Sequence, residues 1–322
     1  MTTPVVRSRR CAGATPSARG FTLVELMVAL TLGILIAGAA LAALLAARTS
    51  YSSVDSSSQL RENARFVFSQ MERIVNEAGF VNLSDFDFPT TTQRPPLRGF
   101  DNTSVSIATG TPVYGAGVGV NQSDVLVVSF SGASRNGVAD GSMINCAGIA
   151  EPQTATAGSA TSIFHLVASA TGEPTFACTF LNPATGIWAT VPLAAGVESM
   201  QMLYGSDGVK PNNDPPALPA GADSVPESYL TASQLTGATP AGTLDNWRRV
   251  RSVRVGMVLR GAPNTAADRA ATAQTFNVLG NGLSLASDSG SIFTVAADGR
   301  LRQQIIFTIH LRNTQDPVSL LR

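Results

Sequence analysis

Charged residues are scarce in this chain. Asp, Glu, Lys and Arg make up 14% of the 322 residues, apolar residues make up 44%, and Lys210 is the one lysine. This charge content is low for a cytosolic globular protein, and the many Gly, Ala, Ser and Thr residues suit a secreted, β-rich body with many turns. The length allows one large or two modest domains with real cores.

Histidine is scarcer still, and the usual constellations for catalysis are missing. His165 and His310 both fall in predicted strands, with no Cys, Asp or Glu at ligand or triad spacing. The glycines of Gly115–Gly119 lack the full fingerprint of a phosphate loop. The sequence therefore predicts no enzyme: no catalytic residues, no cofactor, no metal site and no small-molecule substrate.

An excess of basic charge is confined to the amino terminus. Four arginines precede the first apolar run with no acid among them, at positions 7, 9, 10 and 19. Without them the chain has 18 basic against 22 acidic residues, a formal net charge of −4. A mildly acidic body is poorly suited to phosphate backbones, so we expect no nucleic-acid partner.

Cysteine is limited to three positions. Cys11 lies in the basic leader, which should face the cytoplasm, whereas Cys146 and Cys178 lie in the part that we expect to be exported, where a disulfide can persist. We therefore expect Cys146 and Cys178 to form a disulfide, with two buried free thiols as the alternative. Their spacing resembles no metal site.

A nearly unbroken apolar run extends over Phe21–Ala47. As a helix it would be roughly 40 Å long, more than the ~30 Å of a bilayer core. The preceding arginines should keep the amino terminus cytoplasmic. A secretory signal would have a shorter apolar region followed by its cleavage site, whereas here the small residue Gly20 comes before the run. We therefore expect a membrane helix.

Glu25 is the only charged residue within that run. A carboxylate at bilayer depth costs about 2.5–3.5 kcal/mol, so Glu25 needs a partner. Cleavage between Gly20 and Phe21 would create a free α-amine about one helical turn away. The amine of a neighbouring chain in a helix bundle is an equally good partner. A stray acid near the lipid headgroups is the alternative.

The segment Arg19–Leu26 resembles the class III signal of type IV prepilins and of type II secretion pseudopilins. The resemblance implies cleavage after Gly20 by prepilin peptidase and N-methylation of Phe21. It also implies that Glu25 pairs with the amine of an adjacent subunit during filament assembly. The leader of residues 1–20 is longer than is usual for this branch, which leaves the true start codon open.

The helical period continues beyond the apolar run. Between Tyr51 and Gly79, apolar residues recur at steps of three and four, and they are Leu60, Ala64, Val67, Met71, Ile74 and Ala78. Gly79 is the expected helix stop. We expect this stripe to pack on a sheet, with a coiled coil as the alternative.

The remaining chain is predicted to be β-structure with long loops. The predicted strands are Asp124–Phe130, Ser162–Ser169, Thr175–Leu181, Gly186–Leu193, Val197–Tyr204, Arg251–Arg260 and Arg302–Arg312. The last two alternate cleanly between apolar and polar residues. Two long loops are predicted, Gly205–Asp245 and Gly261–Arg300.

Several segments resemble PilW-type minor pilins, namely residues 60–80, 196–205, 247–260 and 300–313. One departure is that Glu72-Arg73 is not followed by the usual acidic residue. The resemblance implies a minor pilin that joins other minor and major pilins in a complex that primes pilus assembly and sits at the tip. A type II secretion minor pseudopilin is the alternative in the same class, and a signal-anchored periplasmic binding protein or enzyme is the alternative from another class.

Two polar clusters have open interpretations. The first cluster could supply calcium ligands or form a solvated turn, and its members are Asp207, Asn212, Asn213 and Asp214. The second is basic, and its members are Arg248, Arg249, Arg251 and Arg254. It could meet an acidic partner or even DNA, and the interpretation that we favour is a basic strand edge that discourages aggregation or meets an acidic face of another pilin.

The predicted fold class is α+β, a long amino-terminal helix packed on an antiparallel β-sheet body. The expected parts are a prepilin leader (residues 1–20), a transmembrane or filament-core helix (21–47), an amphipathic helix continuing into the body (48–80) and a β-rich periplasmic or pilus-surface domain (81–322). We expect a single pass through the bacterial inner membrane before assembly and a place in the pilus at the cell surface afterwards. The expected partners are prepilin peptidase, other minor and major pilins and inner-membrane lipid.

Overall fold

The computed structural model describes residues 20–81, 95–113, 119–154, 160–216, 225–266 and 273–313. The leader before Gly20, including Cys11, and most of the glycine-rich stretch at 115–119 lie outside the described residues. The chain divides into two units, residues 1–51 and 52–322. We describe each unit by itself.

The first unit contains the amino-terminal part of α1 (Leu23–Glu77). Every side chain over Phe21–Ala47 is exposed. In the described part of the chain, α1 is the one helix long and apolar enough to cross a membrane, with a mean hydropathy of 2.5 over its most apolar stretch. This finding concerns length and composition alone.

In the second unit, the rest of α1 packs on the body along a single stripe. The buried residues of the stripe are Ser56, Leu60, Ala64, Val67, Met71, Ile74, Val75 and Ala78. The predicted packing of this amphipathic segment on a sheet is confirmed. The helix ends at Glu77, and Gly79 follows with a φ of 73°, a left-handed conformation that favours glycine.

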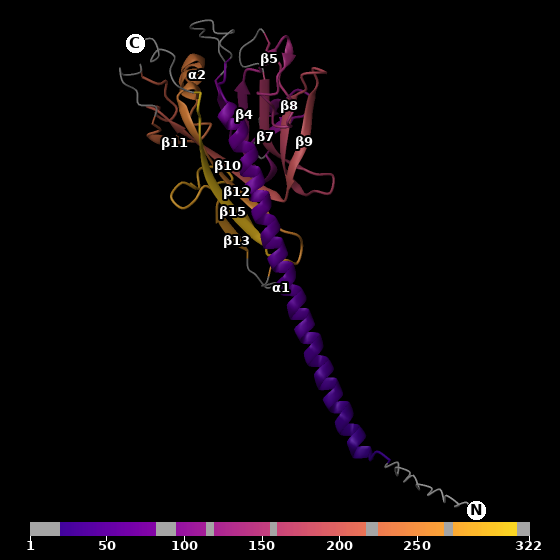
Figure 1. Cartoon of the computed structure of the whole chain (residues 1–322). Coiled ribbons are helices and arrows are strands. Elements are labelled where there is room, and N and C mark those ends of the chain that lie inside the picture. The colour runs from indigo at the N-terminus through magenta and orange to yellow at the C-terminus, as the bar shows by residue number, and fades with distance from the viewer. Residues whose placement is uncertain are drawn as a thin grey trace, which may run out of the picture. The chain divides into compact units, whose positions relative to one another are not determined.

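Two antiparallel sheets form the body (Figure 1). The larger sheet has the order β1 (Leu97–Phe100), β4 (Val125–Phe130), β7 (Ala160–Ala168), β8 (Pro174–Leu181) and β9 (Trp188–Ala195). The smaller sheet has the order β11 (Ser228–Leu230), β10 (Val197–Ser206), β12 (Val250–Arg260) and β15 (Arg302–His310). The predicted α+β class, with a long helix on an antiparallel body, is confirmed.

All seven predicted strands are present, with ends shifted by up to two residues. The two predicted long loops, however, contain regular structure. The first holds β11 and most of α2 (Pro240–Arg248), and the second holds the hairpin of β13 (Gln274–Asn277) and β14 (Ile292–Val295). The described body also contains two further hairpins and a short 3₁₀ helix. One hairpin joins β2 (Ser104–Ser106) and β3 (Thr111–Val113), and the other joins β5 (Ser134–Arg135) and β6 (Val138–Ala139). The 3₁₀ helix is η2 (Val120–Gln122).

The larger of two hydrophobic clusters in the described body lies between α1 and the two sheets. Phe68 of α1 meets Phe307 of β15 edge to face, with ring centroids 5.1 Å apart. Tyr204 and Trp247 meet in the same manner, with centroids 4.8 Å apart. Such pairs add about 0.5–1.5 kcal/mol to the burial of their area.

Hydrogen bonds from the residues just before β4 to β10 connect the two sheets. Ser123 Oγ accepts a hydrogen bond from Met200 N at 3.0 Å, and Asp124 Oδ2 accepts one from Met202 N at 2.8 Å. Asp124 N donates in turn to Met200 O. The free side of β10 is thereby covered at Met200–Met202, and burial raises the pKa of the Asp124 carboxyl well above its usual range.

Candidate functional site

The residues around the predicted cleavage position are open to solvent. Gly20 and Phe21 precede the first turn of α1, and the Phe21 side chain is 89% exposed. No atom of the described chain lies within 4 Å of the position that a Cβ would take at Gly20. The Gly20–Phe21 peptide bond is therefore accessible and lies outside the helix.

Thr22 and Glu25 form a capping box at the start of α1. Thr22 Oγ1 accepts a hydrogen bond from Glu25 N at 3.2 Å, and Glu25 Oε2 accepts one from Thr22 N at 3.3 Å. Each side chain thereby satisfies a backbone N–H that has no partner within the helix. Glu25 thus has a structural task within its own chain in addition to any pairing with another subunit.

Our sequence interpretation of Glu25 did not include this task. The signal was present, because a Thr followed three residues later by Glu, directly before an apolar run, is the sequence mark of a capping box. The interpretation considered only the charge in an apolar setting. Glu25 shares one open helix face with the small and apolar side chains of Val28, Ala29 and Leu32.

The body behind α1 contains the Cys146–Cys178 disulfide, with Cα atoms 6.1 Å apart. Both cysteines are buried, and the bond ties the loop before β7 to the middle of β8. The same loop is held by Asn145, whose Nδ2 donates to Glu151 Oε1 at 2.7 Å. The covalent link therefore fixes a loop that meets the end of α1, where the backbone of Ile144 hydrogen-bonds to the Glu77 carboxyl.

Two carboxyl groups lie where α1 ends against this loop. Burial raises the pKa of Glu77 to about 7, against an opposing effect of Arg73, and the nearby Glu151 adds to the rise. Burial also raises the pKa of Glu151, although its hydrogen bond from Asn145 acts the other way. In the described structure, Glu77 Oε2 has no hydrogen-bond partner.

An ion-pair network links three strands of the smaller sheet at the end where β10 and β15 begin. Arg302 Nε donates to Glu198 Oε2 at 2.6 Å, and Arg260 Nη1 donates to Glu198 Oε1 at 2.9 Å. Arg302 and Arg260 also bind Asp298 and Glu173. Glu198 and Arg302 are each only 4% exposed, so the network ties the starts of β10 and β15 to the end of β12.

The two histidines do not approach a reactive group in the described structure. His165 Nε2 lies 2.8 Å from Thr179 Oγ1 within the larger sheet, and burial lowers the pKa of His165 to about 4. His310 is exposed at the end of β15.

The oxygen-rich residues at 207–214 serve contacts within the chain. Asp207 is buried and pairs with Arg251 at 3.4 Å. Asp214 accepts hydrogen bonds from the N and Oγ1 atoms of Thr239, the residue that caps α2. Over the described ranges, no group of three or more His, Cys, Asp or Glu is placed to hold a metal ion.

The interpretation of the arginine cluster as a strand edge is wrong. β12 lies between β10 and β15, so Arg251 and Arg254 belong to an interior strand. Arg249 donates to Pro216 O, and Arg254 Nε donates to Leu279 O at 3.3 Å. Arg248 pairs with Asp245. Arg249 and Arg254 therefore hold loops beside the smaller sheet, whereas the pair of Arg248 lies within α2.

Two protein-family models match the chain. The model described as type IV pilus-assembly protein W matches residues 163–313, and the model described as the prokaryotic N-terminal methylation motif matches residues 16–41. The first match covers β7 to β15 but not residues 60–80, on which the resemblance to PilW-type pilins partly rested. The second covers the predicted cleavage position, the capping box and the apolar run up to residue 41.

Among solved structures, the chain is similar to a type IV-like pilin from Thermus thermophilus. The two share 12% sequence identity, the similarity covers 80% of this chain and 97% of the other, and the TM-score is 0.38. No curated protein matches the chain. The similarity of this chain to a known family therefore rests on the two family-model matches.

Proposed function

The two family-model matches support a type IV pilin of the PilW family, and on that premise we propose that the chain is a minor pilin that takes part in initiating pilus assembly. The observation that carries the proposal is the arrangement at residues 20–25. An accessible Gly20–Phe21 bond precedes a helix whose only charge over Phe21–Ala47 is Glu25.

The proposed processing acts on this chain and is not performed by it. Prepilin peptidase would cut after Gly20, and the new amino terminus at Phe21 would then be methylated. An exposed peptide bond outside the helix supports such a cut, because a protease binds its substrate in an extended form. Removal of residues 1–20 leaves a chain that begins with the apolar part of α1.

Glu25 is the proposed assembly residue. In a bilayer or a filament core its carboxylate costs about 2.5–3.5 kcal/mol without a partner, and the amine of Phe21 on an adjacent subunit would offset that cost. The open face that Glu25 shares with Val28, Ala29 and Leu32 supports this pairing, since small and apolar side chains allow a second helix to approach closely.

The parts proposed for the mature chain follow from this. Residues 21–47 would cross the inner membrane before assembly and lie in the filament core afterwards, residues 48–80 would lead into the body, and residues 81–322 would form the surface domain. The apolar helix and the methylation motif fit a membrane-anchored pilin. The body would act through contacts with other minor and major pilins and not as an enzyme.

Processing tests the proposal directly. We expect mass spectrometry of the chain from membranes to show an amino terminus at N-methylated Phe21. Gly20→Val should leave the leader attached, because a branched side chain replaces the small residue before the cut, and the unprocessed chain should be absent from sheared pili. Normal removal of the leader in Gly20→Val would contradict the proposal.

Two alternatives give different outcomes in a deletion strain. Loss of surface pili and twitching with normal secretion favours the type IV pilus, whereas loss of secretion with normal pili favours a type II secretion pseudopilin. A substitution at Glu25 addresses the other alternative. If the chain is a signal-anchored periplasmic binding protein, both piliation and secretion would be normal in a strain that carries this substitution.

A further inference from the structure

Four strands form the outer edges of the two sheets, and three of these edges are short or interrupted. β1 has four residues and β11 has three. β9 contains Pro192 and a register shift against β8. Short length, proline and irregular register are the devices by which proteins protect an edge strand from pairing with another chain.

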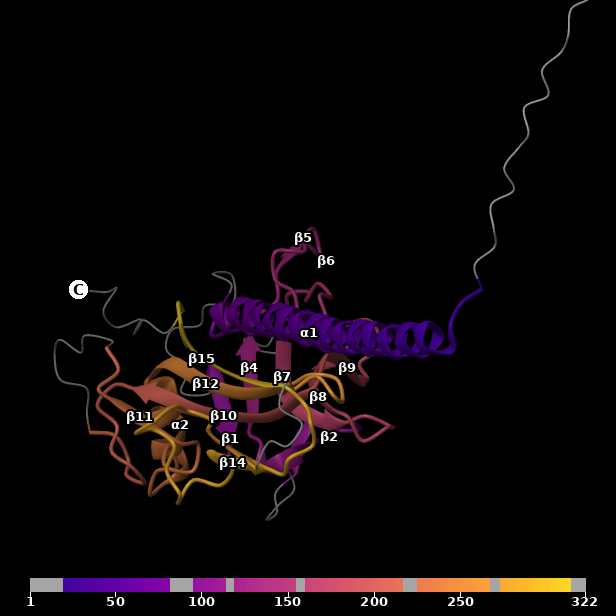
Figure 2. The same ribbon diagram turned by 90° about the horizontal axis from the view of Figure 1, so that it is seen from below.

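The fourth edge strand, β15, has none of these devices. Its nine residues contain no proline or glycine, and its pairing with β12 is regular from Arg302 to His310. Most residues of β15 are only half-buried, whereas almost all residues of its neighbour β12 are buried. Figure 2 shows β15, β12 and β10 side by side in that order.

The hydrogen bonds to β12 determine which backbone groups of β15 point outward. Leu311 N donates to Arg251 O at 2.9 Å, and Gly261 N donates to Leu301 O at 2.8 Å. Since bonding alternates along an antiparallel ladder, the odd-numbered residues of β15 direct their N–H and C=O groups toward β12.

The even-numbered residues direct theirs away from the sheet, and they are Arg302, Gln304, Ile306, Thr308 and His310. Over the described ranges, no backbone or side-chain partner is found for these outward groups. They form a row of donors and acceptors to which a further strand can be added.

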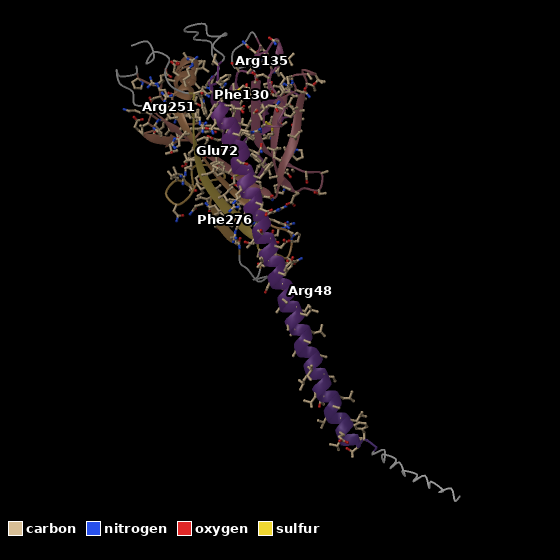
Figure 3. All side chains as sticks on the ribbon, in the orientation of Figure 1. Arg48, Glu72, Phe130, Arg135, Arg251 and Phe276 are labelled. Atoms are coloured by element: carbon tan, nitrogen blue, oxygen red, sulfur yellow. A yellow bond between two sulfur atoms is a disulfide. The ribbon has the colours of Figure 1, made fainter. Side chains whose placement is uncertain are left out.

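A depression of about 470 Å³ lies beside this row. It lies between β13 and β15 and is lined by Thr275, Phe276, Asn277, Gly280, Asn281, Gln304 and Ile306. Ile306 is 36% exposed, and Phe276, labelled in Figure 3, belongs to β13. An apolar side chain on an added strand, opposite Ile306, would enter this depression.

Charge at the two ends of β15 differs. At the start, Arg302 is already paired with Glu198 and Asp298. At the end, His310 and Arg312 are exposed, and no described carboxylate lies within ion-pair distance of Arg312. An antiparallel strand would place its amino-terminal end beside these two residues, where a carboxylate would be favoured.

The same charges disfavour a second copy of this chain. Antiparallel pairing of two β15 strands, centred on Ile306, would place Arg312 of each copy opposite Arg300 of the other. Like charges directly opposite each other destabilise a strand pair.

We propose that the outer edge of β15 is a β-augmentation site for an extended segment of a different protein chain. The segment runs antiparallel to β15, carries a carboxylate near its amino end and places an apolar side chain opposite Ile306. Backbone hydrogen bonds supply affinity in such sites, and the side-chain depression supplies selectivity. The site does not depend on the pilin function, because binding is a property of the purified chain.

A synthetic peptide tests the site with the full mature chain in detergent micelles. The probe is fluorescent acetyl-Asp-Thr-Thr-Val-Leu-Val-Thr-Val-Thr-amide, whose leucine falls opposite Ile306 when its aspartate falls opposite His310. We expect saturable binding by fluorescence anisotropy. Arg312→Ala should weaken binding several-fold and reduce its dependence on salt.

One substitution in the chain and one modification of the probe each remove a hydrogen bond at the outer edge of β15. Neither removes a hydrogen bond between β15 and β12. Ile306→Pro removes one outward N–H and should weaken binding at least about tenfold, whereas the matched variant Ile306→Thr keeps that N–H and should weaken binding less. If Ile306→Pro fails to fold, a probe N-methylated at its leucine removes the corresponding bond from the peptide side and should bind at least about tenfold more weakly to the unchanged chain.

Four results would overturn the proposal. They are the absence of saturable binding, equal binding of the plain and N-methylated probes, binding that appears only after residues 314–322 are removed, and self-association that Ile306→Pro abolishes. The third would make the chain's own carboxyl-terminal segment the occupant, and the fourth would make it a second copy. None of them bears on cleavage after Gly20, so failure of this site is distinguishable from failure of the proposed function.

Discussion

At the end of α1, Glu77 is partly buried, and burial raises its pKa to about 7. The folded chain therefore binds this proton more tightly than the unfolded chain, whose carboxyl has the ordinary value of 4.5. Protonation of Glu77 therefore contributes to the free energy of unfolding. This contribution is fully present below about pH 4.5 and is lost as the pH rises through about 7. We expect the body to be less stable at pH 8 than at pH 5 for this reason.

Glu77→Gln should remove that part of the pH dependence. Because the carboxyl is partly exposed and screened, we expect a gain at pH 8 on the order of 1 kcal/mol in the free energy of unfolding and little change at pH 5. Urea unfolding of the detergent-solubilised chain at both pH values provides the measurement. The exposed Glu72, on the same helix, is the matched control as Glu72→Gln. An equal effect of both variants would refute the role of burial.

The pair of Arg302 and Glu198 is the second residue-scale case. Both side chains are 4% exposed, and Arg302→Met leaves Glu198 with one of its two arginine partners. We expect Arg302→Met to lower the free energy of unfolding by about 3 kcal/mol, because the buried carboxylate of Glu198 loses one of its two ion-pair partners. The double variant Arg302→Met with Glu198→Gln should recover part of this loss. A double variant as unstable as the sum of both single ones would contradict this account.

The sequence offers little on such pairs. Glu198 and Arg302 are 104 residues apart, and nothing local to either side chain predicts their meeting. Nothing local predicts the pair of Arg251 and Asp207 either. Asp207 directly follows the neighbouring strand β10, whereas the sequence pattern led us to place Arg251 on an exposed strand edge. Local pattern predicts which side of a strand a residue occupies, but the order of strands decides whether that strand is an edge.

At the scale of elements, periodic segments could be predicted and short ones could not. Val253, Val255, Met257 and Leu259 of β12 are buried as their alternation predicts, although most residues of the other face of this interior strand are buried too. The helical stripe from Leu60 to Ala78 is also buried as predicted. β13 and β14 have four residues each, too few for a period to stand out.

Helix α2 is short as well, but its start carries a signal that we did not use. Thr239 caps the helix and accepts a hydrogen bond from Gly242 N, and Pro240 occupies its first turn. The capping box of Thr22 and Glu25 was missed in the same way. Capping signals occupy few residues, so they are easily overlooked beside long apolar patterns.

The disulfide is the element-scale link between the loop before β7 and β8. With a sequence separation of 32 between Cys146 and Cys178, we expect the double variant Cys146→Ala with Cys178→Ala to lower the free energy of unfolding by about 3–4 kcal/mol in the chain-entropy model. Thermal unfolding of the variant should match that of the unchanged chain under reducing conditions. Unchanged stability after reduction would contradict a structural role for the bond.

For the whole molecule, two tasks of Glu25 have to be separated. The carboxyl caps α1 through Thr22 N within its own chain, and it is the proposed partner of a neighbouring amine. Glu25→Gln removes the charge but keeps an oxygen that can complete a capping box, whereas Thr22→Val removes the hydroxyl cap, worth about 1 kcal/mol, and keeps the charge. The two variants therefore affect assembly differently if charge pairing matters.

The most direct test of the proposed function is the amount of this chain in sheared pili, measured by immunoblot at equal amounts of processed chain in the membrane. The account predicts that Glu25→Gln is cleaved and inserted normally but is lost from the pili, whereas Thr22→Val enters them at close to the normal level. Glu25→Gln present in pili at the normal level would contradict the account.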